Sequence, residues 1–369
     1  EMIETKDLLN FLKKEKIEFF SGVPDSVLKS TSAFLEKNKL NHHITANEGS
    51  AVAMAIGYYL ATKKIACAYM QNSGLGNALN PLISISHPKV YSIPLMLMIG
   101  WRGSPGIADE PQHKVKGAIT TNILKLLNIK YCILNNKKDF IKLKKLIKFS
   151  RTNNAPIAFL IKKNILLSDN KKIKKIKVNS NIKRKDVIEN LLDLVKKNSK
   201  IIATTGFTSR ELHQIRILKK KDNGDDFYMV GGMGHASMVS LGISIKTNKE
   251  VICLDGDGSF LMHLGSTVNI GQKKRKNFKH ILFNNFSHES VGGQTTNIDK
   301  VDIKKLVEAV RYKKYFVLNK KKEIKKILKS FLKQNGPSLL EVKTQQGSIN
   351  NLKRPQNLLS IKKEFIKKF

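Results

Sequence analysis

Two oxygen-bearing side chains in the second half of the chain have the spacing of a metal site. Asp257 follows the strand-like run 251–254, and Asn285 follows the run 280–283, so the two residues are 28 positions apart. That separation matches one strand–helix–strand unit, and neighbouring parallel strands would bring both side chains to one edge of a sheet. A carboxylate and an amide oxygen suit Mg²⁺, whose other ligands are phosphate or water oxygens. We therefore expect a magnesium ion at this pair.

Glycine-rich turns near this pair predict a site for a diphosphate. Residues 256–259 read Gly-Asp-Gly-Ser, and residues 231–236 read Gly-Gly-Met-Gly-His-Ala. Glycines let a ligand approach the backbone closely, and N–H groups at the start of a helix attract phosphate. A lone Gly-Asp-Gly is also ordinary turn chemistry, so the pairing with Asn285 carries the prediction. The residues expected to line the diphosphate are Gly232, Gly234, Gly256, Asp257, Gly258 and Ser259.

Polar residues also follow the strand-like runs of the first half. Glu48 comes after the run 43–46 and begins a predicted helix, where a glutamate would also complement the helix dipole. Asp25 comes after the run 17–23, where it would cap the next helix well. The sequence alone leaves open whether these two carboxylates serve helix starts or chemistry.

The segment 101–113 follows a very apolar run and is too polar to belong to a core. It contains Arg102, which could pair with an anionic group through two parallel hydrogen bonds. It ends in Gln112 and His113, and the histidine is the natural acid–base candidate of the segment. We expect these three side chains to contact a small anionic substrate.

Short apolar runs alternate with helical stretches along the whole chain. Unbroken apolar strands between helices predict parallel sheets that are covered on both faces. Six runs in each half predict an α/β protein with two similar domains, each a parallel sheet of about six strands flanked by helices. The domains are residues 1–167 and 186–369, joined by the polar, Lys-rich linker 168–185. The expected strands are residues 17–23, 43–46, 65–70, 92–99, 129–134, 156–161, 201–205, 227–230, 251–254, 280–283, 315–318 and 338–342.

The charge of the chain is strongly basic, with 67 Lys and Arg against 29 Asp and Glu and a formal net charge of +38. A polyanion-binding protein is one interpretation. However, the lysines gather in runs at 137–148, 171–177 and 320–329, which suggest solvated helix faces and a linker. Aromatic residues make up only 7% and do not interleave with these runs, as a nucleic-acid stacking surface would require. We therefore expect no nucleic-acid partner, although the charge would attract a small anionic substrate.

Cysteine use and hydropathy point to a cytoplasmic protein. Cys67, Cys132 and Cys253 are far apart in apolar runs, which predicts buried free thiols rather than disulfides or a zinc site. No apolar run approaches the roughly 20 residues of a membrane span, and the first residues do not read as a signal peptide. We expect no membrane partner.

The Gly-Asp-Gly segment, followed one strand–helix–strand unit later by Asn-Asn, resembles the motif of thiamine-diphosphate-dependent enzymes. The resemblance implies thiamine diphosphate and Mg²⁺ as cofactors, with the metal held by Asp257, Asn285 and the main-chain carbonyl of Ser287. Asn284 would then be a structural neighbour, although the sequence leaves an exchange of the two asparagines open. Met233 matches the large apolar residue that supports the bent cofactor in this family, with a core methionine as the alternative.

The same resemblance implies roles for the carboxylates of the first half. In the family, one buried Glu hydrogen-bonds N1′ of the aminopyrimidine ring and promotes removal of the C2 proton, and Glu48 has this position. Asp25 matches an acidic residue that faces the substrate and relays protons, and a helix cap remains the alternative. His288 and Glu289 are expected near the reactive end of the cofactor. The two domain types meet across a subunit interface in this family, which implies a homo-oligomer with active sites at that interface.

The best-known decarboxylases of this superfamily carry an extra domain between the two halves, and this chain has no room for one. The resemblance is therefore to short, two-domain members. The chain resembles the phosphonopyruvate decarboxylase family over essentially its whole length, which implies conversion of 3-phosphonopyruvate to phosphonoacetaldehyde and CO₂ in phosphonate biosynthesis. Sulfopyruvate or another 2-oxo acid is the alternative substrate with the same mechanism, and a basic nucleic-acid-binding protein is a remote alternative. The strings that carry the resemblance are Gly-Val-Pro-Asp-Ser, Asn-Glu-Gly, Gln-Asn-Ser-Gly-Leu-Gly-Asn, Trp-Arg-Gly, Asp-Glu-Pro-Gln-His and Ser-Val-Gly-Gly-Gln.

Overall fold

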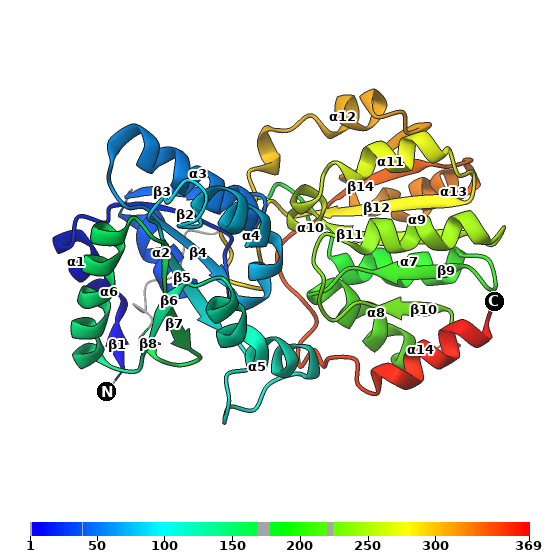
Figure 1. Ribbon diagram of the computed structural model, residues 1–369. Helices are drawn as coiled ribbons and strands as arrows, with labels where there is room; N and C mark the ends of the chain where they lie inside the picture. Colours follow the sequence, from blue (N-terminus) through cyan, green and yellow to red (C-terminus); the bar gives the residue numbers. More distant parts are fainter. Residues whose placement is uncertain (1, 39, 168–177, 220–223) are drawn as a thin grey trace. The chain divides into compact units, whose positions relative to one another are not determined.

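Each of the two structural units of the chain is built around one six-stranded parallel sheet (Figure 1). The first unit comprises Glu1–Lys175 and Val291–Gln294, and the second comprises Ile176–Ser290 and Thr295–Phe369. The computed structural model describes residues 2–38, 40–167, 178–219 and 224–369.

The segment that joins the two halves is described only in part. Residues 168–177 of the predicted linker 168–185, and with them the Lys-rich run 171–177, lie outside the described residues. Residues 178–183 are irregular, and the first helix of the second half already begins at Arg184. The short segment Val291–Gln294 belongs to the first unit, where the buried Gln294 Nε2 donates a hydrogen bond to Ser32 Oγ at 2.7 Å.

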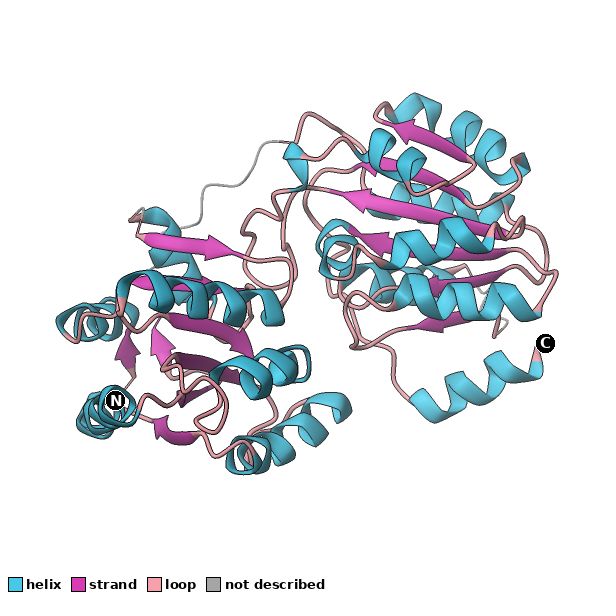
Figure 2. Cartoon of the chain, turned by 45° about the horizontal axis from the view of Figure 1, so that its top comes forward, coloured by secondary structure: helices cyan, strands magenta, loops and turns pink. Residues whose placement is uncertain are grey.

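The sheet of the first unit has the strand order β3-β2-β4-β5-β7-β6, and every neighbouring pair is parallel. Its central strands are buried along nearly their whole length, as expected for apolar strands that have helices on both faces (Figure 2). The strands are β2 (Phe19–Gly22), β3 (Asn41–Ile44), β4 (Cys67–Gln71), β5 (Met96–Trp101), β6 (Lys130–Leu134) and β7 (Ile157–Lys162). A separate two-stranded parallel sheet pairs β1 (Ile3–Glu4) with β8 (Leu166–Leu167).

Helices of the first unit bury one hydrophobic core on each face of its sheet. Helices α1, α2 and α6 contribute to one core, for example through Leu12 and Ile147, and α3, α4 and α5 contribute to the other through residues such as Val52 and Leu124. The helices are α1 (Thr5–Lys14), α2 (Lys29–Lys37), α3 (Glu48–Thr62), α4 (Leu75–Pro81), α5 (Pro111–Leu126) and α6 (Phe140–Asn153), with short helical turns η1 (Asn72–Gly74), η2 (Leu82–Ser86) and η3 (Lys137–Asp139).

The sheet of the second unit has the order β10-β9-β11-β12-β14-β13, again with all neighbours parallel. Helices α7, α8 and α13 cover one face, and α9, α10, α11 and α12 contribute to the core on the other. The strands are β9 (Lys200–Ala203), β10 (Asp226–Tyr228), β11 (Val251–Gly256), β12 (Phe278–Asn284), β13 (Lys314–Leu318) and β14 (Ser338–Lys343). The helices are α7 (Arg184–Leu194), α8 (Phe207–Leu218), α9 (Ala236–Lys246), α10 (Asp257–Met262), α11 (Ser266–Lys273), α12 (Ile303–Ala309), α13 (Ile324–Lys333) and α14 (Leu358–Lys367), with turns η4 (Ile298–Lys300) and η5 (Lys321–Glu323).

The two sheets have the same connectivity, because β2, β3, β4, β5, β6 and β7 occupy the places that β9, β10, β11, β12, β13 and β14 occupy in the second sheet. In each sheet the chain leaves its first strand toward one edge and then returns to the other side of that strand. Ligands of such sheets bind beyond the carboxyl ends of the strands at this reversal point. The loops after β2 and β4, and after β9 and β11, are therefore the places to look for a site.

The predicted fold class is confirmed, and each of the twelve predicted strands overlaps a strand of the structure. The largest boundary difference is in the run 92–99, where β5 begins only at Met96. Ser92 has a φ of 53°, a left-handed conformation that cannot continue a strand. The Lys-rich runs 137–148 and 320–329 lie on α6, α13 and their preceding turns, where most of the lysines are exposed. Among the described helices, none combines the length and the hydropathy that crossing a bilayer requires.

Candidate active site

Glu48 begins α3, directly after the loop that follows the edge strand β3. The side chain of Asn47 caps this helix by accepting a hydrogen bond from the N–H of Ser50 at 2.9 Å. Glu48 is only 6% exposed, and Asn77 Nδ2 donates to its Oε2 at 2.7 Å. Gly74 packs so closely that a Cβ at this position would lie 2.3 Å from Cγ of Glu48. A helix start, an amide and a glycine thus hold the carboxylate in one place.

Asp25 lies at the reversal point of the first sheet and contacts two elements. Its Oδ2 accepts hydrogen bonds from the N–H groups of Val27 and Leu28 at 3.1 and 3.2 Å, in the turn before α2. Its Oδ1 accepts one from Gln71 Nε2 at 2.7 Å, at the end of β4. Burial raises the pKa of Asp25, and the hydrogen bond from Gln71 opposes this effect. Asp25 therefore orders the turn and still presents a buried carboxyl group beside a polar side chain.

Arg102 follows β5 and makes a bidentate ion pair with Asp109. The Arg102 Nε and Nη2 atoms donate to the two carboxylate oxygens of Asp109 at 2.7 and 2.5 Å, and Nη1 donates to Ser26 Oγ at 3.1 Å. Burial alone would raise the pKa of Asp109, but the Arg102 hydrogen bonds outweigh it and lower the pKa below its usual range. The sequence predicted that Arg102 would pair with an anionic group through two parallel hydrogen bonds. In the structure Asp109 of the same loop makes such a pair with it.

The loop that carries Arg102 is joined to the neighbouring strand end and to α5. Asn72 Nδ2 donates to the carbonyl of Arg102 at 3.0 Å, and Asn72 Oδ1 accepts from the N–H of Arg102 at 3.2 Å. Gln112 and His113 lie in the first turn of α5 and are half-buried. Gly103 lets the loop pack closely against the start of α5, because a Cβ on Gly103 would lie 1.8 Å from the carbonyl oxygen of His113. The structure therefore places Arg102, Gln112 and His113 on the loop after β5 and the first turn of α5, whereas Asp25 lies after β2.

In the second unit, Asp257 is the first residue of α10 at the end of β11. Its Oδ1 accepts a hydrogen bond from the N–H of Gly258 at 2.8 Å. Its Oδ2 accepts from the N–H of Ser287 at 3.1 Å and from Thr296 Oγ1 at 3.2 Å. These donors are neutral, and burial raises the pKa of Asp257 to about 7 despite them. A bound cation would favour the ionised form, so a divalent metal fits this carboxylate.

Asn285 lies beside Asp257, as its spacing predicted. The N–H of Ser287 donates to Oδ1 of Asn285 at 3.0 Å as well as to Asp257, so both side-chain oxygens face the same backbone group. The chain turns sharply here, since Phe286 has a left-handed φ of 60°. The side chain of Asn284 is fully buried and donates to Glu341 Oε1 at 2.7 Å. The geometry therefore favours Asn285 over Asn284 as the metal ligand.

Ser259 connects three loops at the reversal point of the second sheet. Its Oγ accepts a hydrogen bond from the N–H of Gly234 at 3.0 Å and lies 2.9 Å from Thr204 Oγ1, just after β9. Gly232 and Gly234 have φ values of 65° and 88°, which glycine adopts without strain. Apart from Gly256 itself and its two chain neighbours, no described residue has an atom within 4 Å of the place where a Cβ on Gly256 would stand. These loops can therefore accept a ligand close to the backbone.

The side chains of Met233 and His288 both lie close to Gly258. A Cβ on Gly258 would lie 3.0 Å from Met233 Cε and 2.8 Å from His288 Cε1. Met233 is half-buried and lies outside the hydrophobic cores formed by the described residues, so the interpretation as a core methionine is disfavoured. Burial lowers the pKa of His288 to about 4, so this imidazole is neutral at physiological pH.

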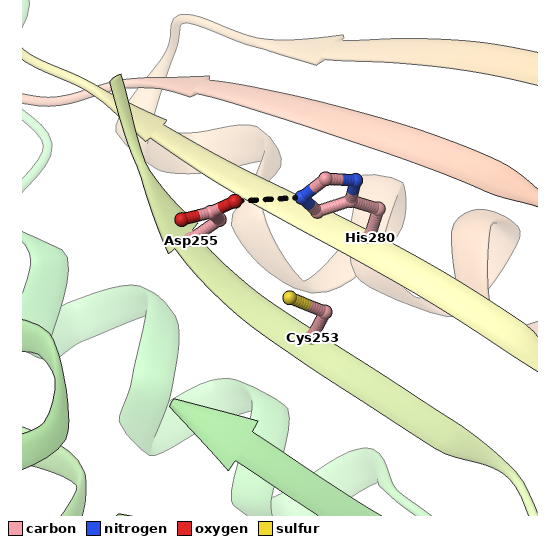
Figure 3. A group of neighbouring side chains, drawn as sticks. All are labelled: Cys253, Asp255 and His280. Atoms are coloured by element: carbon pink, nitrogen blue, oxygen red, sulfur yellow. Dashed lines mark hydrogen bonds and ion pairs between the residues drawn. The ribbon is translucent and has the colours of Figure 1, made fainter. Parts of the chain in front are cut away.

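Cys253, Asp255 and His280 form a buried cluster just before the Gly-Asp-Gly segment (Figure 3). His280 Nε2 lies 3.2 Å from Asp255 Oδ2, and its Nδ1 lies 3.0 Å from the hydroxyl of Tyr312. Burial raises the pKa of the Cys253 thiol well above its usual value, whereas a metal site would need the thiolate. We interpret the cluster as a polar link between β11 and β12. The prediction that the three cysteines are free and buried is confirmed.

Sequence reasoning missed the partners that hold the predicted side chains in place. Asn77 was visible in the polar segment 71–77, but no spacing rule pairs it with Glu48. Asp109 was visible in the same loop as Arg102, and the alternation of opposite charges there was the available signal. The buried pair of Arg184 and Glu211 could not be inferred, because it joins two helices that start 23 residues apart.

Comparisons with known proteins identify the family of this chain. The family model of the N-terminal TPP binding domain of thiamine pyrophosphate enzymes matches residues 5–123, and that of the C-terminal TPP binding domain matches residues 204–342. A phosphonopyruvate decarboxylase of Streptomyces viridochromogenes is 31% identical over 96% of this chain and 92% of its own length. A phosphonopyruvate decarboxylase of Streptomyces hygroscopicus is 30% identical over 96% and 91%. A sulfopyruvate decarboxylase of Methanosarcina acetivorans is 24% identical over 98% of both chains.

Each match lies within one half of the chain, since the N-terminal domain model spans β2 to β5 and the C-terminal one spans β10 to nearly the end of β14. The similarity to the Streptomyces proteins extends across nearly the full chain. Thiamine pyrophosphate is the same molecule as thiamine diphosphate, so the cofactor implied by the sequence motif is confirmed. The protein is thus a carboxy-lyase, and the chain belongs to the family of thiamine-diphosphate-dependent decarboxylases that includes the phosphonopyruvate decarboxylases.

Proposed function

We propose that this decarboxylase converts 3-phosphonopyruvate to phosphonoacetaldehyde and CO₂, with Mg²⁺ as its metal, as a step of phosphonate biosynthesis. The carrying observation is the full-length similarity to two phosphonopyruvate decarboxylases, at 31% and 30% identity over 96% of the chain. The sulfopyruvate decarboxylase that also covers the full chain is 24% identical.

The second unit would bind the metal and the diphosphate. Asp257, Asn285 and the carbonyl of Ser287 are the proposed Mg²⁺ ligands, which the shared N–H of Ser287 supports by keeping the first two oxygens together. Gly232, Met233, Gly234, Gly256, Gly258 and Ser259 are the proposed neighbours of the cofactor. Bound thiamine diphosphate supplies the electron sink for cleavage of the carbon–carbon bond.

The first unit would supply the proton-transfer groups. Glu48 is the proposed hydrogen-bond partner of the aminopyrimidine ring, and its burial and fixed position support this role. Burial raises the pKa of Asp25, which favours a role for this carboxyl group in proton exchange. His113 and Gln112 are proposed to contact the substrate. Arg102 would contribute through its ordered loop and its Nη1 atom, because its other donors bind Asp109.

We also propose a homo-oligomer in which active sites form between subunits. Separate proteins of Methanocaldococcus jannaschii, named sulfopyruvate decarboxylase subunit alpha and subunit beta, match 26% and 32% of this chain at 39% and 37% identity. Their names support an assembly of such parts in the family. The three buried free cysteines further support a reducing compartment, and we propose the cytoplasm.

The test is aldehyde formation, followed as NADH oxidation by an added reductase that is active on the aldehyde. Phosphonopyruvate, sulfopyruvate and pyruvate are compared with and without thiamine diphosphate and Mg²⁺. We expect a cofactor-dependent rate that is much higher with phosphonopyruvate. A preference for sulfopyruvate would favour the second candidate, which the similarity to the Methanosarcina acetivorans enzyme supports.

A further inference from the structure

Glu289 contacts the side-chain amide of the proposed metal ligand Asn285. Asn285 Nδ2 donates a hydrogen bond to Oε2 of Glu289 at 3.0 Å, while Asn285 Oδ1 accepts from the N–H of Ser287. Only this orientation of the amide satisfies both neighbours, because the opposite one would place its NH₂ against an N–H and its oxygen against a carboxylate. Glu289 therefore fixes which atom of Asn285 faces Asp257.

Glu289 is itself held by a buried cation and by the backbone near the end of β14. Arg184 Nη1 lies 3.6 Å from Glu289 Oε2, and the N–H of Gly347 donates to Glu289 Oε1. Arg184 Nη2 in turn donates to the carbonyl of Gly347 at 3.3 Å. The side chains of Arg184 and Glu289 thus both hydrogen-bond the backbone of Gly347, which restricts the rotamers that Glu289 can adopt.

Arg184 is anchored by a second carboxylate. Its Nε donates to Glu211 Oε2 at 2.6 Å, and the two side chains are 7% and 1% exposed. The other oxygen of Glu211 accepts from the N–H of Ile349 at 3.0 Å. A buried charge without partners would be costly, so this array is stable only as a complete set. The array joins the starts of α7 and α8, the segment after β14 and the loop after β12.

We infer that Glu289 is a positioning residue for the metal centre, held by Arg184 and Glu211 so that the amide oxygen of Asn285 faces the metal. This inference rests on the proposed function, because it takes Asp257 and Asn285 as the metal ligands. Groups that hydrogen-bond a metal ligand orient it and tune its affinity, and losing one weakens metal binding by roughly 10- to 100-fold. Glu289 would therefore act on the metal through Asn285.

The experiment uses the full-length protein saturated with thiamine diphosphate and titrated with Mn²⁺, with free Mn²⁺ counted by electron paramagnetic resonance and Mg²⁺ added as competitor. We expect Glu289→Ala to raise the Kd of the metal by about 10- to 100-fold. Glu289→Gln keeps the size and one acceptor and should give a smaller increase. In both variants we also expect the Mg²⁺ concentration for half-maximal activity to rise in step with the metal Kd.

Two comparison variants separate the possible explanations. Asp226→Asn breaks the buried pair of Asp226 with Arg216 in the same unit, with bonds of 2.6 and 2.8 Å, and should lower the unfolding temperature without changing the metal Kd. Asp257→Asn removes a proposed ligand and tests the metal site itself. If Asp257→Asn binds the metal weakly while Glu289→Gln and Glu289→Ala keep the normal metal Kd, the metal site stands but the role of Glu289 is overturned. An equal weakening in Asp226→Asn also overturns it, and a normal Kd in Asp257→Asn overturns the proposed metal site.

Discussion

The two units place different chemistry on the same strand order. At the reversal point of the first sheet, the loops after β2 and β4 bring together Asp25 and Gln71, a carboxyl group and an amide. At the equivalent point of the second sheet, the loops after β9 and β11 bring together the hydroxyls of Thr204 and Ser259 beside glycines. Topology therefore determines where a site can form, and the loop residues determine what it can bind.

The buried carboxylates Asp25 and Asp257, one in each unit, have different surroundings. Burial raises the pKa of both Asp25 and Asp257, but Asp25 also has the positive charge of Arg102 nearby. The hydrogen bonds to Asp257 come from two backbone N–H groups and the hydroxyl of Thr296. These surroundings favour the proposed roles, proton exchange for Asp25 and cation binding for Asp257.

The largest expected effect separates catalysis in the first unit from cofactor binding in the second. Glu48→Gln should lower kcat by about 10²- to 10⁴-fold, because the amide cannot exchange a proton with the cofactor ring. The affinity for thiamine diphosphate should change far less, and circular dichroism should show a folded protein. Glu15→Gln, which alters an ion-paired carboxylate of the same unit, is the matched control. Normal turnover in Glu48→Gln would contradict the proposal that the first unit supplies the catalytic proton-transfer group.

The second prediction addresses the other side of the comparison. Asp257→Asn keeps the size of the side chain but removes the charge that a divalent cation needs. We expect the metal Kd to rise by more than the roughly 10- to 100-fold that losing a hydrogen-bond partner of a ligand causes. Calorimetric titration with Mg²⁺ in the presence of thiamine diphosphate measures this change. If Asp257→Asn lost turnover but bound metal and cofactor normally, the two units would not differ as proposed.

Much of this architecture could be predicted from the sequence, because unbroken apolar runs and strand-end loops have local signals. The spacing of Asp257 and Asn285 also sufficed to predict that they lie together. One strand–helix–strand unit separates them both in the sequence pattern and in the structure. The side-chain partners could not be predicted in this way. Asn77 meets Glu48 only because α4 packs against α3, and Arg102 meets Asp109 only because the loop after β5 turns back on itself.

The sequence could not predict that residues 291–294 belong to the first structural unit. The predicted boundary assigns this segment to the second domain, since it follows the metal loop directly. Its place is determined by the burial of Gln294 and its hydrogen bond to Ser32, a contact between residues 262 positions apart. Periodicity reports the environment of a strand or helix but carries no information about such a distant pair.

The third prediction uses two glycines of one loop region to test how tightly Glu48 must be held. A Cβ on Gly74 would lie 2.3 to 2.5 Å from side-chain atoms of Glu48. A Cβ on Gly76 would have no described atom within 4 Å apart from its own residue, its chain neighbours and the nearby backbone of its helix. Gly74→Ala should therefore displace the carboxylate and lower kcat by about 10- to 100-fold. Gly76→Ala, in the helix that follows, should stay within about twofold and gain slightly in stability. Equal kcat values for the two variants would show that the position of Glu48 is not critical.

The smallest expected effect concerns the hydrogen bond from Gln71 to Asp25. This bond favours the ionised carboxylate and opposes the increase in pKa that burial causes, so Gln71→Met should raise the pKa of Asp25 further. The limb of the kcat/KM profile that reports Asp25 should then move to higher pH, whichever direction the proton travels. We expect less than about a tenfold change in kcat/KM at the optimum, since the carboxyl group remains. Ser73→Ala removes only the hydroxyl that donates to Gln71 Oε1 at 3.0 Å, and its profile should move less in the same direction. An unchanged profile in Gln71→Met would assign Asp25 to the turn before α2 alone, and the reversal points of the two sheets would then differ in chemistry through Glu48 and not through Asp25.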